Sequence, residues 1–238
     1  MNRTTLAGWA FAALLFGLMG ARAAEDAPVV IRLMTDDIVV EADGTSTHTA
    51  HVEIFATNEA AAKTVGQTAL PYLETAQELE IVEAYTLKSG GQKIPVAPSA
   101  IYTQQPQGSP QVLQINEVRQ KVIVFPNVAA GDTVAYTIRL RTNRPAFPGH
   151  FTHMEAFPRS VAYNEVRGTL TAPKSLPIKV ENHDVEIRAE ESATATTYRW
   201  RYSAPGSQTV QVSSVSPLDQ IPRVLFSSIG GQEELGRL

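Results

Sequence analysis

The histidines are the first residues of this sequence that could do chemistry. His48 and His51 are three residues apart, as are His150 and His153. On a helix this spacing would place both imidazoles on one face, where they could bind zinc, but in a strand residues three apart face opposite sides. Both pairs lie in segments with an extended pattern. We therefore predict that neither pair forms a metal site by itself.

The carboxylates give no stronger signal for catalysis or metal binding. Glu78 and Glu80 share one face of a predicted strand next to charged residues, an arrangement that is usually solvent-exposed, whereas acid–base catalysis needs a cleft that raises one pKa. Asp36, Asp37 and Asp43 lack the regular ligand spacing of a calcium loop.

Nucleophilic chemistry is equally weakly supported. No G-x-S-x-G motif marks a serine hydrolase, and the chain has no Cys, which excludes disulfides, thiolate metal sites and a cysteine nucleophile. We therefore predict no catalytic residue, no metal ligand and no cofactor.

An aromatic stripe is the remaining candidate for ligand binding. Tyr198, Trp200 and Tyr202 share one face of a predicted strand, and Arg199 and Arg201 share the other. The stripe could form a platform on which sugars stack, or it could anchor the core. The core interpretation is favoured, because aromatic side chains make the largest burial contribution to a β-sandwich.

The rest of the chain is patterned as short strands that would position these residues. In residues 133–141, Val134, Tyr136, Ile138 and Leu140 alternate with side chains expected to face water. The same period of two recurs in three other segments. The residues expected on their apolar faces are Val166, Gly168, Leu170 and Ala172 in the first, Val185, Ile187 and Ala189 in the second, and Val210 and Val212 in the third. Gly-, Asp- and Pro-containing turns separate these runs, which is typical of an antiparallel β-sandwich or barrel.

One short helix interrupts the strand pattern. Asn58 is a suitable N-cap, residues 59–65 favour helix, and Gly66 could end the helix in the left-handed conformation. We expect an all-β antiparallel β-sandwich of many short strands with at most one or two short helices, formed as one domain by residues 24–216.

The N-terminus has the three parts of a secretory signal peptide. A short basic start at Arg3 precedes an uncharged apolar segment, and small residues surround a cleavage site between Ala23 and Ala24. The alternative is an uncleaved membrane anchor, but the apolar core is short for a spanning helix, which needs about 20 residues. We therefore expect residues 1–23 to be removed and the mature chain to be periplasmic or secreted, in a Gram-negative-type bacterium, without a membrane span.

The charge balance of the mature chain excludes one class of partner. Without Arg3 and Arg22, 18 basic residues remain against 24 acidic ones. Nucleic acid and anionic lipid both require clustered Lys and Arg. The nearest cluster, Arg139, Arg141 and Arg144, is better explained as the solvated face of a strand. We expect no nucleic-acid partner.

Several segments together resemble a known family. Residues 78–101, ELEIVEAYTLKSGGQKIPVAPSAI, and residues 125–136, FPNVAAGDTVAY, resemble the secreted bacterial module known as domain of unknown function 3857. The Asp43-Gly44 turn, the 147–151 segment FPGHF, the 171–177 segment TAPKSLP and the Tyr198-Arg199-Trp200 strand fit the same family. The similarity extends over about residues 30–229.

The resemblance implies a setting for the module. In this family it usually precedes a transglutaminase-like domain with a papain-type Cys-His-Asp triad, and residues 222–228 resemble the segment that leads into that domain. We therefore expect residues 217–238 to be a tail. Because the chain contains no Cys, it cannot itself supply the thiolate of such an enzyme. A stand-alone copy and a truncated fragment both remain open.

These observations favour a non-catalytic interaction or accessory module of the bacterial envelope, with a protein or envelope component as partner. The resemblance points to a transglutaminase-like or peptidase partner, and an edge strand could bind an extended segment by β-augmentation. A secreted carbohydrate-binding module is the alternative, and an enzyme that uses Ser or carboxylates is a third possibility.

Overall fold

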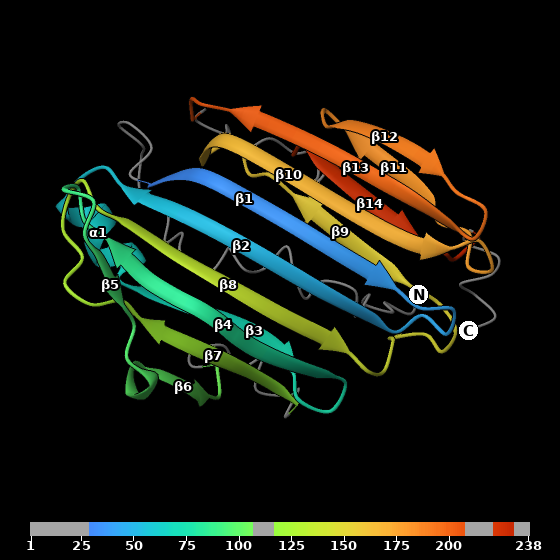
Figure 1. Ribbon diagram of the computed structural model, residues 1–238, viewed down its shortest axis with the longest axis horizontal. Helices are drawn as coiled ribbons and strands as arrows, with labels where there is room; N and C mark the ends of the chain where they lie inside the picture. Colours follow the sequence, from blue (N-terminus) through green and yellow to red (C-terminus); the bar gives the residue numbers. More distant parts are fainter. Residues whose placement is uncertain (1–28, 107–116, 208–220, 231–238) are drawn as a thin grey trace, which may run out of the picture.

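Alternating apolar side chains fold most of this chain into strands, as the sequence predicts. The computed structural model describes residues 29–106, 117–207 and 221–230, and within them it is an all-β fold with one α-helix (Figure 1). The expected signal peptide, its Ala23–Ala24 cleavage site and the predicted strand at Val210 and Val212 lie outside the described residues. No helix in the described ranges has both the length and the apolar character needed to cross a membrane.

The largest sheet, sheet A, has eight strands in the order β12-β13-β10-β1-β2-β8-β4-β5. Strands β1 and β10 pair in parallel, and every other pair in sheet A is antiparallel. The strands, in chain order, are β1 (Val29–Val40), β2 (Ser46–Ala56), β4 (Gln77–Leu87), β5 (Lys93–Pro95), β8 (Thr133–Thr142), β10 (Ala162–Pro173), β12 (Glu186–Glu191) and β13 (Ala195–Ala204).

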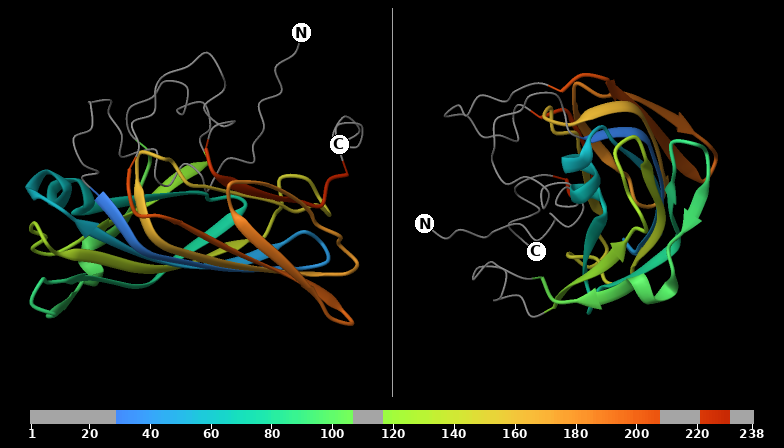
Figure 2. Two further views of the ribbon diagram at one scale, coloured as in Figure 1. Left: turned by 90° about the horizontal axis from the view of Figure 1, so that it is seen from above. Right: turned by 90° about the vertical axis from the view of Figure 1, so that its left-hand side faces the viewer.

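Two three-stranded antiparallel sheets lie against the inner face of sheet A, which is curved (Figure 2). Sheet B consists of β3 (Gln67–Leu73), β7 (Val118–Val124) and β6 (Ile101–Gln104), and sheet C consists of β11 (Lys179–His183), β14 (Arg223–Ser227) and β9 (Thr152–Ala156). Beside sheet B, Phe125 packs on Tyr136 of β8, with 6.4 Å between ring centroids. From sheet C, Phe226 packs on Trp200 of β13 at 5.2 Å. The hydrophobic core fills the space between these layers.

Strand β14 changes the expected domain boundary. Residues 217–238 were expected to be a tail, but Arg223–Ser227 forms the central strand of sheet C, between β11 and β9. Val224 and Phe226 of this strand are fully buried. The sandwich therefore extends beyond residue 216.

The α-helix of the described residues, α1 (Glu59–Val65), occurs where the sequence predicts it and lies at one end of sheet A (Figure 1). Asn58 caps it, since its side-chain oxygen accepts a hydrogen bond from the backbone N–H of Ala61 at 2.8 Å. The prediction for Gly66 was wrong: it has φ −59° and ψ −16°, a right-handed conformation. The chain passes directly from Gly66 into β3, so no left-handed reversal is needed. A short 3-10 helix, η3 (Pro98–Ala100), precedes β6.

The alternation predicted for β8 is confirmed on its inner face, where Val134, Tyr136, Ile138 and Leu140 are all at most 5% exposed. Thr133 and Ala135 were expected to face water, but they are also buried. The Phe55 side chain lies opposite Thr133, and the guanidinium of Arg32 stacks on the Phe55 ring while it donates a hydrogen bond to the Thr133 hydroxyl. Aromatic and basic side chains therefore cover this end of the outer face.

Strands β10 and β12 show how position in the sheet modifies the same alternation. In the central strand β10, Val166, Leu170 and Ala172 are buried as expected. Val185, just before the edge strand β12, is also buried, but Ala189 within β12 is exposed. An edge strand has a neighbour on one side only, so less of its apolar face is covered.

Gly168 allows the aromatic stripe to pack into the core. Gly168 of β10 lies opposite Trp200 of β13, and the indole lies where a Gly168 side chain would be. A Cβ at Gly168 would be 1.8 Å from Cε2 of Trp200. A residue with a side chain would therefore displace the indole from its position between the sheets.

We predict that Gly168→Ala destabilises the protein by about 3 kcal/mol, because the added methyl overpacks a filled core. Urea unfolding measures the loss, and Trp200 emission should shift to longer wavelength. Gly90→Ala is the matched control: nothing lies within 4 Å of a Cβ at Gly90, so the change should stay within about 0.5 kcal/mol. Equal stability of the two variants would contradict this packing.

Candidate functional site

Two polar side chains on apolar strand faces begin the candidate site. Asp36 of β1 lies on the same face as the buried Met34 and Ile38, and His48 of β2 lies on the same face as the buried Ala50. The His48 Nε2 atom is 2.7 Å from Asp36 Oδ1, and both side chains are at most 5% exposed. The inner face of sheet A therefore carries a buried acid–imidazole pair.

Strand β9 brings a second pair against the first. His153 Nε2 is 3.3 Å from Glu155 Oε2, and both side chains are at most 10% exposed. The His153 ring meets the His48 ring edge to face, with 5.4 Å between centroids. Sheets A and C thus bury two carboxyl groups and two imidazoles together, and we call Asp36, His48, His153 and Glu155 the buried cluster.

Burial dominates the electrostatics of the buried cluster. Burial raises the pKa of Glu155 well above its ordinary value, and the Asp36 carboxylate adds to the effect. Burial, assisted by His48, lowers the pKa of His153 to about 3. Burial, with a smaller contribution from Asp36, also raises the pKa of Tyr136. All three shifts favour the uncharged form of the side chain.

One polar atom of the buried cluster, and one of a neighbouring residue, remain without a hydrogen-bond partner in the described part of the chain. Asp36 Oδ2 and the Tyr163 hydroxyl are buried without a hydrogen-bond partner among the described residues. The described residues also contain no group of three or more His, Cys, Asp or Glu side chains arranged to hold a metal ion. The buried cluster is a set of two carboxyl groups and two imidazoles that interact with one another.

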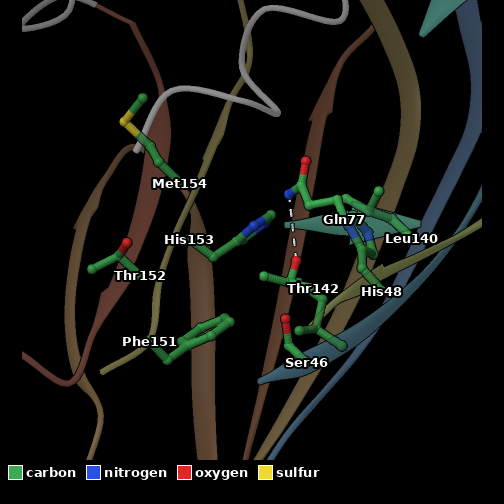
Figure 3. A pocket seen from close by; sticks show the side chains of 10 residues that line it. Ser46, His48, Gln77, Leu140, Thr142, Phe151, Thr152, His153 and Met154 are labelled. Atoms are coloured by element: carbon green, nitrogen blue, oxygen red, sulfur yellow. Dashed lines mark hydrogen bonds between the residues drawn. The ribbon is translucent and has the colours of Figure 1, made fainter. Parts of the chain in front are cut away.

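A pocket opens from the buried cluster toward one corner of the sandwich. His48 and His153 line an inner pocket of about 70 Å³, in which His153 points from β9 toward His48 and Gln77 (Figure 3). Gln77 donates a hydrogen bond to the Thr142 hydroxyl at 3.4 Å there. Five residues of this lining also line a larger pocket of about 270 Å³, which we call the corner pocket: Ser46, Gln77, Thr142, Phe151 and Thr152. Its other lining residues include Gly44, Leu73, Arg144, Phe147 and His150.

Three segments that are distant in the sequence meet beside the corner pocket. Gly44 has φ +84°, and a Cβ on it would be 2.5 Å from the backbone oxygen of His150, so only glycine fits there without strain. Ser228, just after β14, makes two hydrogen bonds with Phe151. The backbone N–H of Phe151 donates to Ser228 Oγ at 2.9 Å, and the backbone N–H of Ser228 donates to the Phe151 carbonyl at 2.9 Å. His150 Nδ1 is 3.5 Å from Ser228 Oγ.

The structure separates the members of each histidine pair, in agreement with the sequence analysis. His48 is buried in the cluster, while His51 faces the outer side of sheet A beside Thr137 and Glu53. His153 enters the cluster, and His150 lines the corner pocket.

The other candidates lie away from both pockets. Glu78 and Glu80 are exposed on sheet A, where they pair with Arg141 and Arg139. In the aromatic stripe, Trp200 is 1% exposed and packs on Phe226, so it offers no free face for a sugar. Tyr198 and Tyr202 are half-buried; Tyr198 donates a hydrogen bond to the Ile178 carbonyl, and Tyr202 stacks on Phe157.

The edge-to-face contact between His48 and His153 was not predicted from the sequence. The available signal was a polar residue on an apolar strand face, as at His48 in the run His48, Ala50, Val52 and Ile54. Such a residue must find a buried partner, because an unpaired buried polar group is costly. The identity of the partner depends on which strands come together, which this local pattern does not specify.

Comparison with known proteins agrees with the family resemblance. The model of the family described as "Domain of Unknown Function with solved-structure structure (DUF3857)" matches residues 42–206. No curated protein shows a significant sequence match.

Among solved structures, the fold is similar to that of a putative protease from Parabacteroides distasonis, with a TM-score of 0.75 and 15% identity over 87% of this chain and 41% of that protein. This chain thus spans less than half the length of that protein. An M1 zinc metallopeptidase from Deinococcus radiodurans gives a TM-score of 0.40 at 11% identity, over 84% of this chain and 44% of that one. A CBM3a-L domain from the Clostridium thermocellum scaffoldin gives 0.30 at 11% identity, over 51% and 72%.

We predict that Asp36→Ala and His48→Leu each destabilise the protein by about 3 kcal/mol, because each leaves the other polar partner buried without its hydrogen bond. The double replacement Asp36→Val with His48→Leu should recover most of the loss, since it removes both polar groups. Urea unfolding at neutral pH measures these changes.

His51→Leu is the control for these variants, because it lies on the same strand and faces outward. Its effect should be below about 1 kcal/mol. Losses in Asp36→Ala and His48→Leu as small as in this control would mean that the buried pair does not exist.

Proposed function

Because this chain belongs to the DUF3857 family, we propose that it is a non-catalytic accessory domain of the bacterial envelope that binds a transglutaminase-like or peptidase partner at the corner pocket. The observation that carries this proposal is the convergence of three segments at one corner. The Asp43-Gly44 turn, the 147–151 segment and Ser228 belong to segments on which the family resemblance was identified. The turn and Ser228 each contact the 147–151 segment beside the corner pocket.

The chemistry of the corner pocket suits recognition. Leu73, Phe147 and Phe151 provide apolar walls, and Arg144 and His150 place polar groups at the same pocket. Apolar surface with a few polar groups that fix orientation is the usual composition of a binding pocket. We expect it to accept an apolar side chain of the partner, with an acidic group placed against Arg144.

The same corner lacks the arrangement of a hydrolase within the described residues. Ser228 and His150 are 3.5 Å apart, but Ser228 Oγ already accepts the backbone N–H of Phe151. No carboxylate in the described part of the chain pairs with His150, although a nucleophile–base pair needs a third group to orient the base. This geometry supports a binding role over a catalytic one.

The open edges of sheet A are less suitable for a partner than the corner pocket. The edge strand β12 carries Glu186, Arg188, Glu190 and Glu191. At the opposite edge, β5 has three residues and ends at Pro95. Charges, short length and proline on an edge strand oppose pairing with another strand. β-Augmentation at these edges is therefore less favoured than binding at the corner.

Site-specific photocrosslinking in the exporting cell tests the proposal. A photoreactive phenylalanine analogue at Phe147 should crosslink to an exported protein that contains a transglutaminase-like or peptidase domain, identified by mass spectrometry. The same analogue at Glu190 on β12 is the control and should not give that product. Arg144→Glu should reduce the Phe147 product several-fold, because it reverses the charge that faces the partner.

Two results would overturn the proposal. One is equal crosslinking from Phe147 and Glu190, or none from either. The other is turnover by the purified chain, in a hydrolase and transglutaminase panel, that is abolished by Ser228→Ala or His150→Ala.

A further inference from the structure

The buried cluster holds two carboxyl groups in a place that is almost closed to solvent. Its members come from three strands in two sheets: Asp36 from β1, His48 from β2, and His153 and Glu155 from β9. Among the described residues, two further titratable side chains interact electrostatically with members of the cluster: Tyr136 of β8 with Asp36, and Tyr163 of β10 with Glu155. From β14, the apolar side chains of Val224 and Phe226 face the cluster. Two ionised carboxylates in such a place would repel each other and would lose their hydration.

The hydrogen-bond geometry distinguishes the two acids. Asp36 has a short contact of 2.7 Å to His48 Nε2, which can donate its proton to a carboxylate. Among the described residues, the hydrogen-bond contact of the Glu155 carboxyl is the longer one of 3.3 Å, to His153 Nε2. Asp36 Oδ2 has no hydrogen-bond partner among the described residues, but the short contact at Oδ1 compensates an anion at Asp36 better than the 3.3 Å contact compensates one at Glu155. Glu155 is therefore the acid that gains more from being neutral.

We propose that the buried cluster is a proton-binding site in which Glu155 is a neutral carboxylic acid that donates its hydrogen to Nε2 of His153, and that this bound proton allows sheet C to pack on sheet A. In this arrangement His153 is the neutral tautomer with its own hydrogen on Nδ1, and the cluster retains a single negative charge at most. The site is independent of the partner proposed for the corner pocket.

The electrostatics of the two β9 side chains support this assignment. Burial, then Asp36, raises the pKa of Glu155, while burial, then His48, lowers the pKa of His153 to about 3. The folded pair therefore holds one proton, on Glu155, from about pH 3 up to the raised pKa of that residue. In the unfolded chain the same groups titrate near 4.5 and 6.5.

These directions fix how the pair affects stability at each pH, because stability falls with rising pH wherever the folded state binds more protons. Between about pH 3 and pH 4.5 the unfolded chain binds two protons and the folded chain one, so acid destabilises the fold in this range. Between pH 4.5 and pH 6.5, the ordinary pKa values of the two groups, the folded and unfolded states each bind one proton. In this range the pair does not change the stability with pH. Above about pH 6.5 the unfolded chain binds none, so the unfolding equilibrium constant should rise by up to tenfold per pH unit until Glu155 ionises.

Glu155→Gln is the variant that tests this site, because an amide keeps the shape and the donor of the neutral acid but cannot ionise. Urea unfolding between pH 5 and 9 measures how the free energy of unfolding depends on pH. The fall in stability above pH 6.5 that the wild-type chain shows should be lost in Glu155→Gln. Glu80→Gln is the matched control, since Glu80 is an exposed Glu that pairs with Arg139, and it should keep the wild-type slope.

Infrared spectroscopy of the folded wild-type chain gives a second measurement that does not depend on a variant's folding. At neutral pH, a protonated carboxylic acid should produce a C=O band that ordinary ionised Asp and Glu side chains lack. That band should be absent in Glu155→Gln and present in Glu80→Gln.

Several results would overturn the proposal. The first is the same pH dependence of the unfolding free energy in the wild-type chain and in Glu155→Gln. The second is the absence, at neutral pH, of the infrared C=O band of a protonated carboxylic acid. The third is loss of slope and band in Asp36→Asn but not in Glu155→Gln, which would place the proton on the other acid. The fourth is a chelator-sensitive stability that requires His48 and His153, which would replace the proton by a metal ion.

Discussion

The packing of sheet C on sheet A depends on four ionisable side chains that are buried between them and have to satisfy one another. Asp36 and His48 come from neighbouring strands of sheet A, whereas His153 and Glu155 come from β9. A shift of β9 by one residue would turn Met154 toward the core and remove both of its ionisable side chains from it, because alternate residues of a strand face opposite sides. The cluster therefore fixes the register of one sheet on the other, and the buried partners make any other arrangement costly.

Small residues on sheet A make room for this cluster. Asp36 has Ala50 opposite it on one neighbouring strand and Gly168 on the other, and beyond Gly168 lies Trp200. The indole crosses Gly168 and contacts Phe226 of sheet C. One row of sheet A thus holds both the acid of the cluster and the aromatic anchor of sheet C. The polar and apolar parts of the interface are built by the same register.

Much of this fold follows from local pattern, while the candidate site does not. The period of two in β8 identifies the inner face correctly, and Asn58 marks the start of α1, because both depend on neighbours in the chain. Gly66 was expected to be left-handed, but the immediate start of β3 leaves no turn to make. The role of Arg223–Ser227 as a central strand depends on its pairing with β9 and β11, whose paired residues are 40 (His183 with Arg223) to 75 (Thr152 with Ser227) positions away in the sequence.

The histidines show the same limit more sharply. Strand geometry correctly indicates that His48 and His51 of β2 face opposite sides. His150 precedes β9, so the same reasoning does not apply to His150 and His153. Strand geometry does not predict the contact between His48 and His153, because the packing of sheet C on sheet A brings these two residues together. A polar residue on an apolar strand face, such as Asp36 or His48, indicates that the residue has a buried polar partner. The local sequence does not identify that partner.

The buried cluster also connects stability to the surface where we place binding. His48 and His153 line the inner pocket, and Phe151 and Thr152 continue that lining into the corner pocket beside Ser228. Strand β9 therefore carries both a part of the corner and half of the cluster. A chain in which β9 were loosely held would lose the shape of the corner together with the packing of sheet C.

The protonation of His153, followed by NMR of the ¹⁵N-labelled imidazole rings across acidic and neutral pH, tests this account most directly. If the cluster is buried as described, His153 stays neutral down to about pH 3, and its ring protons show contacts to those of His48. A His153 ring that titrates near its ordinary value of 6.5 and shows no contact to His48 would contradict the account.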